Sequence, residues 1–80
     1  MVKPRRKQPK KMAGKLRAIR RRLGLSQTQM AKELDLKVAY TVVSAFERGK
    51  QEPDLFILWR YAKLAKVPME TLVDDKAKLP

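Results

Sequence analysis

One segment limits what this chain can fold into. Residues 38–43, Val-Ala-Tyr-Thr-Val-Val, form the single stretch whose β-branched side chains suit a strand. The 80 residues contain no second strand-like segment to pair with it. A lone strand leaves its backbone hydrogen-bonding groups unpaired, whereas a helix satisfies them internally. We therefore predict a helix here too, and an all-α fold class for the whole chain.

The length of 80 residues allows one domain, near the lower limit for unaided folding. Because cysteine and histidine are both absent, disulfides, thiolate nucleophiles, Ser-His-Asp triads and the usual zinc sites are excluded. The eight carboxylates show no paired placement for acid–base chemistry. We expect no enzymatic activity, no metal and no cofactor.

Hydropathy gives no sign of a membrane protein. The longest apolar run, residues 55–59, is too short to cross a bilayer. The basic N-terminus leads into no apolar signal segment. These features predict a cytoplasmic protein with no membrane partner.

Positive charge is concentrated at the N-terminal end. The net charge is +12, and residues 1–22 carry 11 basic and no acidic side chains. Residues 1–11 combine six of these cations with two prolines, so we predict a disordered basic arm whose partner is a polyanion. Its expected contacts to that partner include Arg5, Arg6 and Lys7. The alternative is a solubilising tail or an expression remnant.

Two short helices are predicted next. The first carries an apolar stripe at helical spacing, with Lys15 and the arginines on its other sides, and it ends at Gly24. The stripe consists of Met12, Leu16, Ile19 and Leu23. The second begins with a capping box of Ser26 and Gln29 and a hydrophobic staple of Leu25 and Met30. It runs to about Leu34, with Met30, Ala31 and Leu34 facing inward.

Three further helices complete the expected body, residues 12–74. The third spans about residues 39–48, with Val43 and Phe46 inward and Gly49 in a left-handed conformation. A shorter version capped by Thr41 is the alternative. The fourth begins at the N-cap Asp54 and continues to about residue 66, and the fifth covers residues 69–73. Residues 75–80 form a tail that we expect to fray.

Several landmarks occur in a fixed order along the chain: Leu16-Arg17, Leu23-Gly24-Leu25-Ser26-Gln27, Met30-Ala31, Phe46-Glu47-Arg48-Gly49-Lys50 and Pro53. In this order they resemble the Cro/CI-type (XRE) DNA-binding domains of phage repressors. The resemblance covers residues 12–73. It implies a compact five-helix lambda-repressor-like domain whose helix-turn-helix places its third helix in the major groove. The implied function is a sequence-selective double-stranded DNA-binding transcriptional regulator, acting as a repressor.

One departure concerns the turn before the third helix. Between Ala31 and Glu47 the chain is about two residues longer than the family spacing, with the insertion near residues 35–38. Ala39 also stands where the family has serine or threonine. The register of the base-reading residues depends on this turn.

The resemblance assigns DNA contacts residue by residue. Gln27 would hold a phosphate at the first turn of the second helix. Side chains facing the bases would be Tyr40, Thr41, Ser44 and Ala45, with Lys37 and Val42 as weaker candidates. The expected phosphate contacts are Arg48, Lys50, Arg17, Arg20 and Arg21. Tyr40 has a structural alternative as a half-buried lid, and Glu47 is expected to stabilise the fold, with Arg48 as its candidate partner.

Phe56 and Trp59 fall on the polar side of the fourth helix. Either the fifth helix or the tail covers them, or they form the contact of a homodimer on a two-fold operator. Two alternative functions remain at this stage. One is an antitoxin that binds a cognate toxin or other protein and represses its own promoter. The other is an RNA- or ribosome-associated or coactivator-like adaptor.

Overall fold

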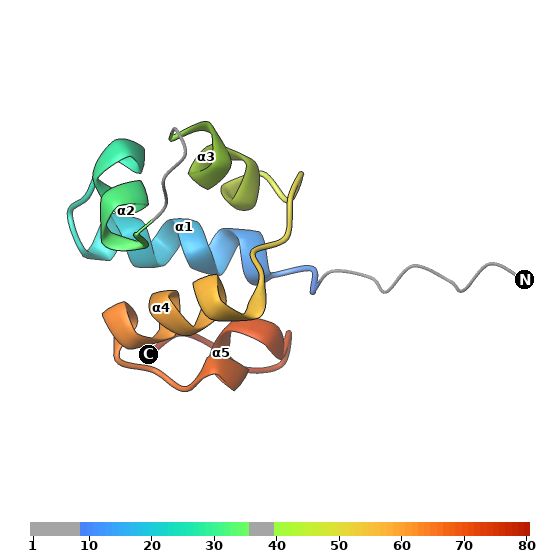
Figure 1. The fold of residues 1–80 in the computed structure, drawn as a ribbon. Coiled ribbons are helices and arrows are strands. Elements are labelled where there is room, and N and C mark those ends of the chain that lie inside the picture. Colours follow the sequence, from blue (N-terminus) through green and yellow to red (C-terminus); the bar gives the residue numbers. More distant parts are fainter. Residues whose placement is uncertain (1–8, 36–39) are drawn as a thin grey trace, which may run out of the picture.

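The computed structural model describes residues 9–35 and 40–80, and within these residues it contains helices and no strand. Five helices follow in order: α1 (Met12–Arg22), α2 (Gln27–Glu33), α3 (Thr41–Glu47), α4 (Leu55–Ala65) and α5 (Met69–Val73). α1 crosses the middle of the molecule, with α2 and α3 on one side and α4 and α5 on the other (Figure 1). The predicted all-α class and five-helix order are confirmed.

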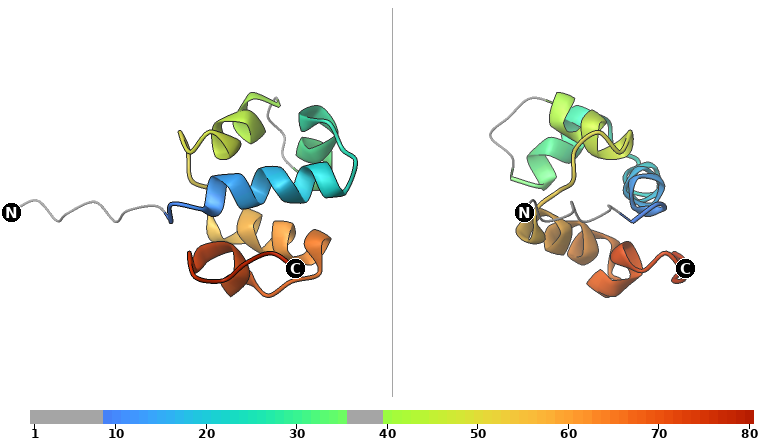
Figure 2. Two further views of the ribbon diagram at one scale, coloured as in Figure 1. Left: turned by 180° about the vertical axis from the view of Figure 1, so that it is seen from behind. Right: turned by 90° about the vertical axis from the view of Figure 1, so that its right-hand side faces the viewer.

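The core lies along α1, because both helix pairs pack their apolar sides against it. Figure 2 shows α1 between these pairs from behind and from the side. The buried apolar side chains are Met12, Leu16, Ile19, Met30, Ala31, Leu34, Val43, Phe46, Leu58, Tyr61, Ala62 and Leu72. All the inward positions predicted for the second and third helices are in this set.

The ends of α1 and α2 form as their sequences predict. Gly24 has φ +71°, and the chain closes a Schellman turn in which Gly24 N donates to Arg21 O and Leu25 N to Arg20 O. At the start of α2, Ser26 Oγ accepts from Gln29 N at 3.0 Å, and Gln29 Oε1 accepts from Ser26 N at 2.8 Å. These two turns fix the angle between α1 and α2.

The ends of α3 and α4 follow the same rules. Gly49 has φ +71°, and Lys50 N donates to Ala45 O at 2.9 Å, which closes a second Schellman turn. Asp54 caps α4, since its Oδ1 accepts from Ile57 N at 2.9 Å. α4 ends at Ala65, followed by Lys66 in the left-handed region at φ 58°.

The start of α3 differs from the prediction. The helix begins at Thr41 rather than near residue 39, and Thr41 is its first helical residue rather than its cap. Tyr40 occupies the N-cap position and makes no side-chain cap hydrogen bond. The turn near residues 35–38, where the sequence predicts the two extra residues, lies outside the described part of the chain except for Asp35.

Two other predictions need correction. Leu23 is 39% exposed rather than part of the closed core, because it lines an open pocket with Leu64 and Leu79. The tail does not fray: Asp75 accepts hydrogen bonds from the start of α1, and Leu79 packs against the core. Arg22 Nη1 also donates to the carbonyl of Pro80 at 2.6 Å. The chain end therefore lies along the α4–α5 side of the molecule (Figure 1).

Candidate nucleic-acid interface

The outer face of α3 is polar and open to solvent. Val43 and Phe46 point into the core, which turns Thr41 and Ser44 the other way. Thr41 is exposed, and Ser44 and Ala45 are half-buried. Two hydroxyls and one methyl group therefore lie on the accessible side of this helix. Hydroxyls donate and accept hydrogen bonds, and a methyl group packs on the thymine methyl.

Tyr40 precedes this face and is 52% exposed. Val42, a weaker candidate, is half-buried and packs against the core. Lys37 lies outside the described residues, as do Arg5, Arg6 and Lys7 of the arm.

Glu47 joins three helices behind this face. Its Oε2 accepts from Arg20 Nε of α1 at 2.6 Å, and its Oε1 accepts from Arg20 Nη2 at 3.0 Å. Gln27 Nε2 of α2 donates to the same Oε1 at 3.4 Å. The side chain of Glu47 is 4% exposed and that of Arg20 is 14% exposed, so the pair is largely shielded from water. These hydrogen bonds fix the end of α3 against the start of α2 and the end of α1.

Arg20 is therefore not a side chain on the outer side of α1, as the sequence led us to expect. Its Nη1 also donates to Leu25 O at 2.9 Å, which uses the remaining edge of the guanidinium. The hydrogen bond to Glu47 raises the pKa of Arg20 above its ordinary value. Sequence inspection missed the pairing because the carboxylate lies 27 positions away. The predicted role of Glu47 in the fold holds, but its partner is Arg20, while Arg48 Nε donates to Ser44 O at 3.4 Å.

Other predicted cations are accessible. Arg17 and Arg21 on α1 are exposed, as are Arg48 and Lys50 where α3 ends. Gln27 is half-buried by its contact with Glu47. The structure thus brings together the end of α3 and the first turn of α2. Arg20, unlike these exposed cations, is largely shielded from solvent.

Phe56 and Trp59 stay exposed on α4, by 56% and 41%. Their ring centroids are 5.6 Å apart with a tilt of 33°. Lys63 Nζ lies 4.6 Å from the centroid of Trp59, and the guanidinium of Arg60 lies 5.9 Å from that of Phe56. Neither α5 nor the tail buries the pair, so the covered alternative is wrong.

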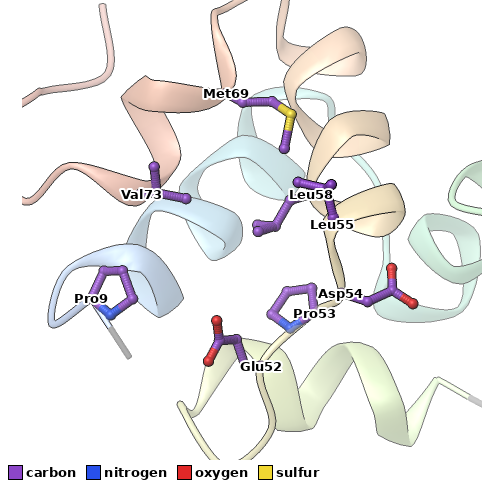
Figure 3. Close-up of a pocket in the computed structure, with 8 residues that line it drawn as sticks. All are labelled: Pro9, Glu52, Pro53, Asp54, Leu55, Leu58, Met69 and Val73. Atoms are coloured by element: carbon purple, nitrogen blue, oxygen red, sulfur yellow. The ribbon is translucent and has the colours of Figure 1, made fainter. Parts of the chain in front are cut away.

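An open pocket of about 790 Å³ lies between the starts of α1 and α4 and the helix α5. Pro9 stands across it from Pro53 and Leu58, with Met69 and Val73 above (Figure 3). The residues lining it are mainly apolar, and the carboxylates of Glu52 and Asp54 lie on one edge.

None of the helices in residues 9–35 and 40–80 is long and apolar enough to span a membrane. In the same residues no cluster of three or more metal-ligating side chains occurs.

Sequence inspection missed two polar residues that organise this architecture. Lys15 was assigned to the polar side of α1 but is 8% exposed, because its Nζ donates to Thr71 O at 2.7 Å and Asp74 O at 2.8 Å. Its position three residues after Met12, beside the apolar stripe, is the signal that was available. Asp75 caps α1 from the tail; the signal for it was the absence of a capping side chain before Met12.

Comparisons with known proteins agree with this geometry. A family model described as Helix-turn-helix matches residues 16–72. Among solved structures, the chain is similar to the P22 c2 repressor protein, crystallised in complex with synthetic operator 9T in the presence of Tl+. The TM-score is 0.71 at 23% sequence identity, over 81% of this chain and 96% of that chain. At this identity the likeness concerns the fold alone. No curated protein sequence matches the chain.

Proposed function

The chain belongs to the helix-turn-helix family, as a DNA-binding transcription regulator of the Cro/CI type, and from this premise we propose that it represses transcription by occupying a sequence-selected operator in double-stranded DNA. The observation that carries the proposal is the outer face of α3. It is polar and accessible, and Glu47 fixes its orientation from behind. A rigid helix that exposes small polar groups fits the width of the major groove.

The proposed base contacts are the hydroxyls of Thr41 and Ser44 and the methyl group of Ala45. Tyr40 precedes them at the N-cap of α3, and Lys37 is a weaker candidate. Tyr40, Thr41, Ser44 and Ala45 are not bidentate readers of guanine or adenine, so we expect these four to discriminate modestly per base pair and DNA shape to supply part of the selectivity.

The proposed phosphate contacts come from several parts of the chain. They are Arg17 and Arg21 on α1, Gln27 on α2, Arg48 and Lys50 after α3, and Arg5, Arg6 and Lys7 in the arm of residues 1–11. Arg20 is withdrawn from this set because Glu47 and Leu25 O occupy its guanidinium. The excess of 11 cations over residues 1–22 supports a strong electrostatic contribution that falls with salt.

Phe56 and Trp59 are the proposed contact between two copies on a two-fold operator. Each ring can bury about 150–250 Å², at about 25 cal/mol per Å². Two half-sites about 34 Å apart on one face of the duplex suit such a pair. Because Arg60 and Lys63 flank the rings, we expect weak dimerisation without DNA and cooperative binding on it.

The test is selection of bound duplexes from a random pool, followed by titration of the selected site and of random DNA. Thr41→Ala and Ser44→Ala should each weaken binding to the selected site by about 1–3 kcal/mol and leave random DNA unaffected. Thr71→Ala on α5 is the matched control, since it removes the same groups on the opposite side of α1 and should leave site preference unchanged.

Two outcomes would contradict the proposal. If both hydroxyl variants keep full site preference, α3 does not read the bases in this register. If structured RNA binds better than every duplex, the chain is an RNA-binding adaptor rather than an operator-binding regulator.

A further inference from the structure

The helix α1 begins without a capping side chain of its own. Lys11 occupies the N-cap position and makes no side-chain cap hydrogen bond, and the first turn contains no acidic residue. Asp75 supplies the missing acceptors from the far end of the chain. Its Oδ1 accepts from Lys11 N at 3.0 Å and its Oδ2 from Lys10 N at 3.1 Å. One carboxylate therefore orients two consecutive peptide groups at the root of the basic arm.

The segment that carries Asp75 is itself held in place by α1. Lys15 Nζ donates to the carbonyls of Thr71 and Asp74, at the end of α5 and directly before Asp75. A cation from α1 thus meets the negative end of α5, while an anion after α5 meets the positive end of α1. These two contacts leave Asp75 little freedom relative to Lys10 and Lys11.

The arm root, residues 9–11, also contacts the body through Pro9. Pro9 O accepts from Met12 N at 3.4 Å, a long hydrogen bond. On its other side Pro9 borders the open pocket, across which lie Pro53 and Leu58 (Figure 3). The two hydrogen bonds to Asp75 join this root to the segment after α5.

That root lies close to the end of α3. A Cβ placed on Gly49 would lie 3.9 Å from the Cβ of Ala13, so the first turn of α1 contacts the turn that carries Arg48 and Lys50. Lys10 and Lys11 therefore directly precede a helical turn that contacts the turn after α3.

We propose that Asp75 is a positioning residue for DNA binding: by holding the backbone of Lys10 and Lys11, it directs residues 1–8 along the same stretch of duplex that the end of α3 contacts. This inference rests on the proposed function. An arm fixed at its root loses less conformational entropy on binding, so more of its phosphate contacts contribute to affinity.

The direction of the change in DNA affinity distinguishes a positioning role for Asp75 from a simple effect of its charge. Removing an acidic side chain from a cationic DNA-binding protein raises its net charge and by itself strengthens binding to a polyanion. Positioning predicts the opposite for Asp75. Asp74 provides a matched control, because its Oδ1 accepts from Lys76 N within the tail and the same substitution changes the charge equally.

The experiment compares Asp75→Ala, Asp75→Asn and Asp74→Ala in the full chain by fluorescence anisotropy with the selected duplex across a salt series. Asp75→Ala should bind roughly five- to tenfold more weakly, and its log–log salt slope should fall by about one to two, since each lost phosphate contact contributes about 0.9. Asp75→Asn, which keeps one acceptor, should be intermediate. Asp74→Ala should bind as well as the unmodified chain or better.

A second comparison tests whether the loss of affinity in Asp75→Ala depends on the cations of the arm. In a full chain that carries Arg5→Gln, Arg6→Gln and Lys7→Gln, adding Asp75→Ala should change affinity by less than about twofold, because the arm no longer contributes these contacts. An equal loss with and without the arm cations would overturn the proposal and assign Asp75 a purely structural role, as would unchanged or tighter binding by Asp75→Ala. If the unmodified chain prefers no duplex, the proposed function itself fails, a result distinct from either of these.

Discussion

The two ends of α1 are joined to the rest of the molecule by different chemistry. Near its start, Lys15 reaches toward α5 and bonds to the carbonyls of Thr71 and Asp74. Near its end, Arg20 reaches toward α3 and bonds to both oxygens of Glu47. Both side chains were expected on the polar face of α1, and both are turned into the structure.

The difference lies in what each cation requires of its partner. Lys15 bonds to carbonyl groups that any sequence with a helix ending at this point would provide, so this contact is tolerant of side-chain changes on α5. Arg20 requires one carboxylate at one position, because its planar guanidinium bonds to two oxygens at once. The α1–α3 contact therefore depends on side-chain identity, and the α1–α5 contact depends mainly on where α5 ends.

The largest expected effect comes from breaking the α1–α3 contact. Glu47→Ala leaves the largely shielded Arg20 without its partner, and we expect a loss of about 3–5 kcal/mol in the free energy of unfolding. Urea denaturation followed by far-UV circular dichroism measures it. The double variant Arg20→Met with Glu47→Met should be closer to the unmodified chain than Glu47→Ala alone, since neither charge remains. A Glu47→Ala chain of unchanged stability would contradict this account of the pair.

The α1–α5 contact should be weaker. Lys15→Met keeps the aliphatic packing but removes the donor to two carbonyls, so we expect a loss of about 1.5–3 kcal/mol by the same denaturation measurement. Arg21→Met, at an exposed position of the same helix, is the control and should stay within about 0.5 kcal/mol of the unmodified chain. Equal stability of the two variants would mean that the bonds to Thr71 O and Asp74 O contribute nothing.

Acid should loosen the start of α1. The backbone donors of Lys11 and Lys10 lower the pKa of Asp75 below its ordinary value of 3.8. A lowered carboxyl pKa gives stability that is complete above the unfolded value and is lost as pH falls through the folded value. Below about pH 4, the protection of residues 10–14 from amide hydrogen exchange should therefore fall. Asp75→Ala should remove this pH dependence, and if it persists in that variant, another group causes it.

The smallest effect is expected at Tyr61, which lies buried near the Arg20–Glu47 pair. No hydrogen-bond partner of its hydroxyl is found among residues 9–35 and 40–80. Tyr61→Phe should therefore leave neutral-pH stability unchanged or slightly raised. Burial first, and then the charge of Glu47, raise the pKa of Tyr61 above its ordinary value of 10.0.

The raised pKa of Tyr61 also predicts how the stability of the chain changes at alkaline pH. The unfolded phenol loses its proton at lower pH than the folded one, so the unmodified chain should lose stability as pH rises above about 10. Tyr61→Phe should lose less over that range in thermal melts. A Tyr40→Phe control should retain the full loss, since the exposed Tyr40 lies away from this buried site.

Local rules account for much of the agreement between sequence and structure. The Ser26–Gln29 capping box, the Asp54 cap and the left-handed Gly24 and Gly49 each depend on atoms only a few residues apart. The inward residues of α2 and α3 followed from helical spacing. The family landmarks rest on these same positions, so the match to the helix-turn-helix family agrees with the resemblance inferred from the sequence.

The amino-acid sequence by itself determined the five helices, most of their ends, most of the core and the family, because those features depend on near neighbours in the chain and on periodic burial. Tertiary structure alone decided which polar groups face one another. Arg20 with Glu47, Lys15 with Thr71 O, and Asp75 with Lys11 N are separated by 27, 56 and 64 positions. A cation at the edge of an apolar stripe is directed to water or to a partner according to what packs beside it, and that neighbour exists only once the helices have assembled.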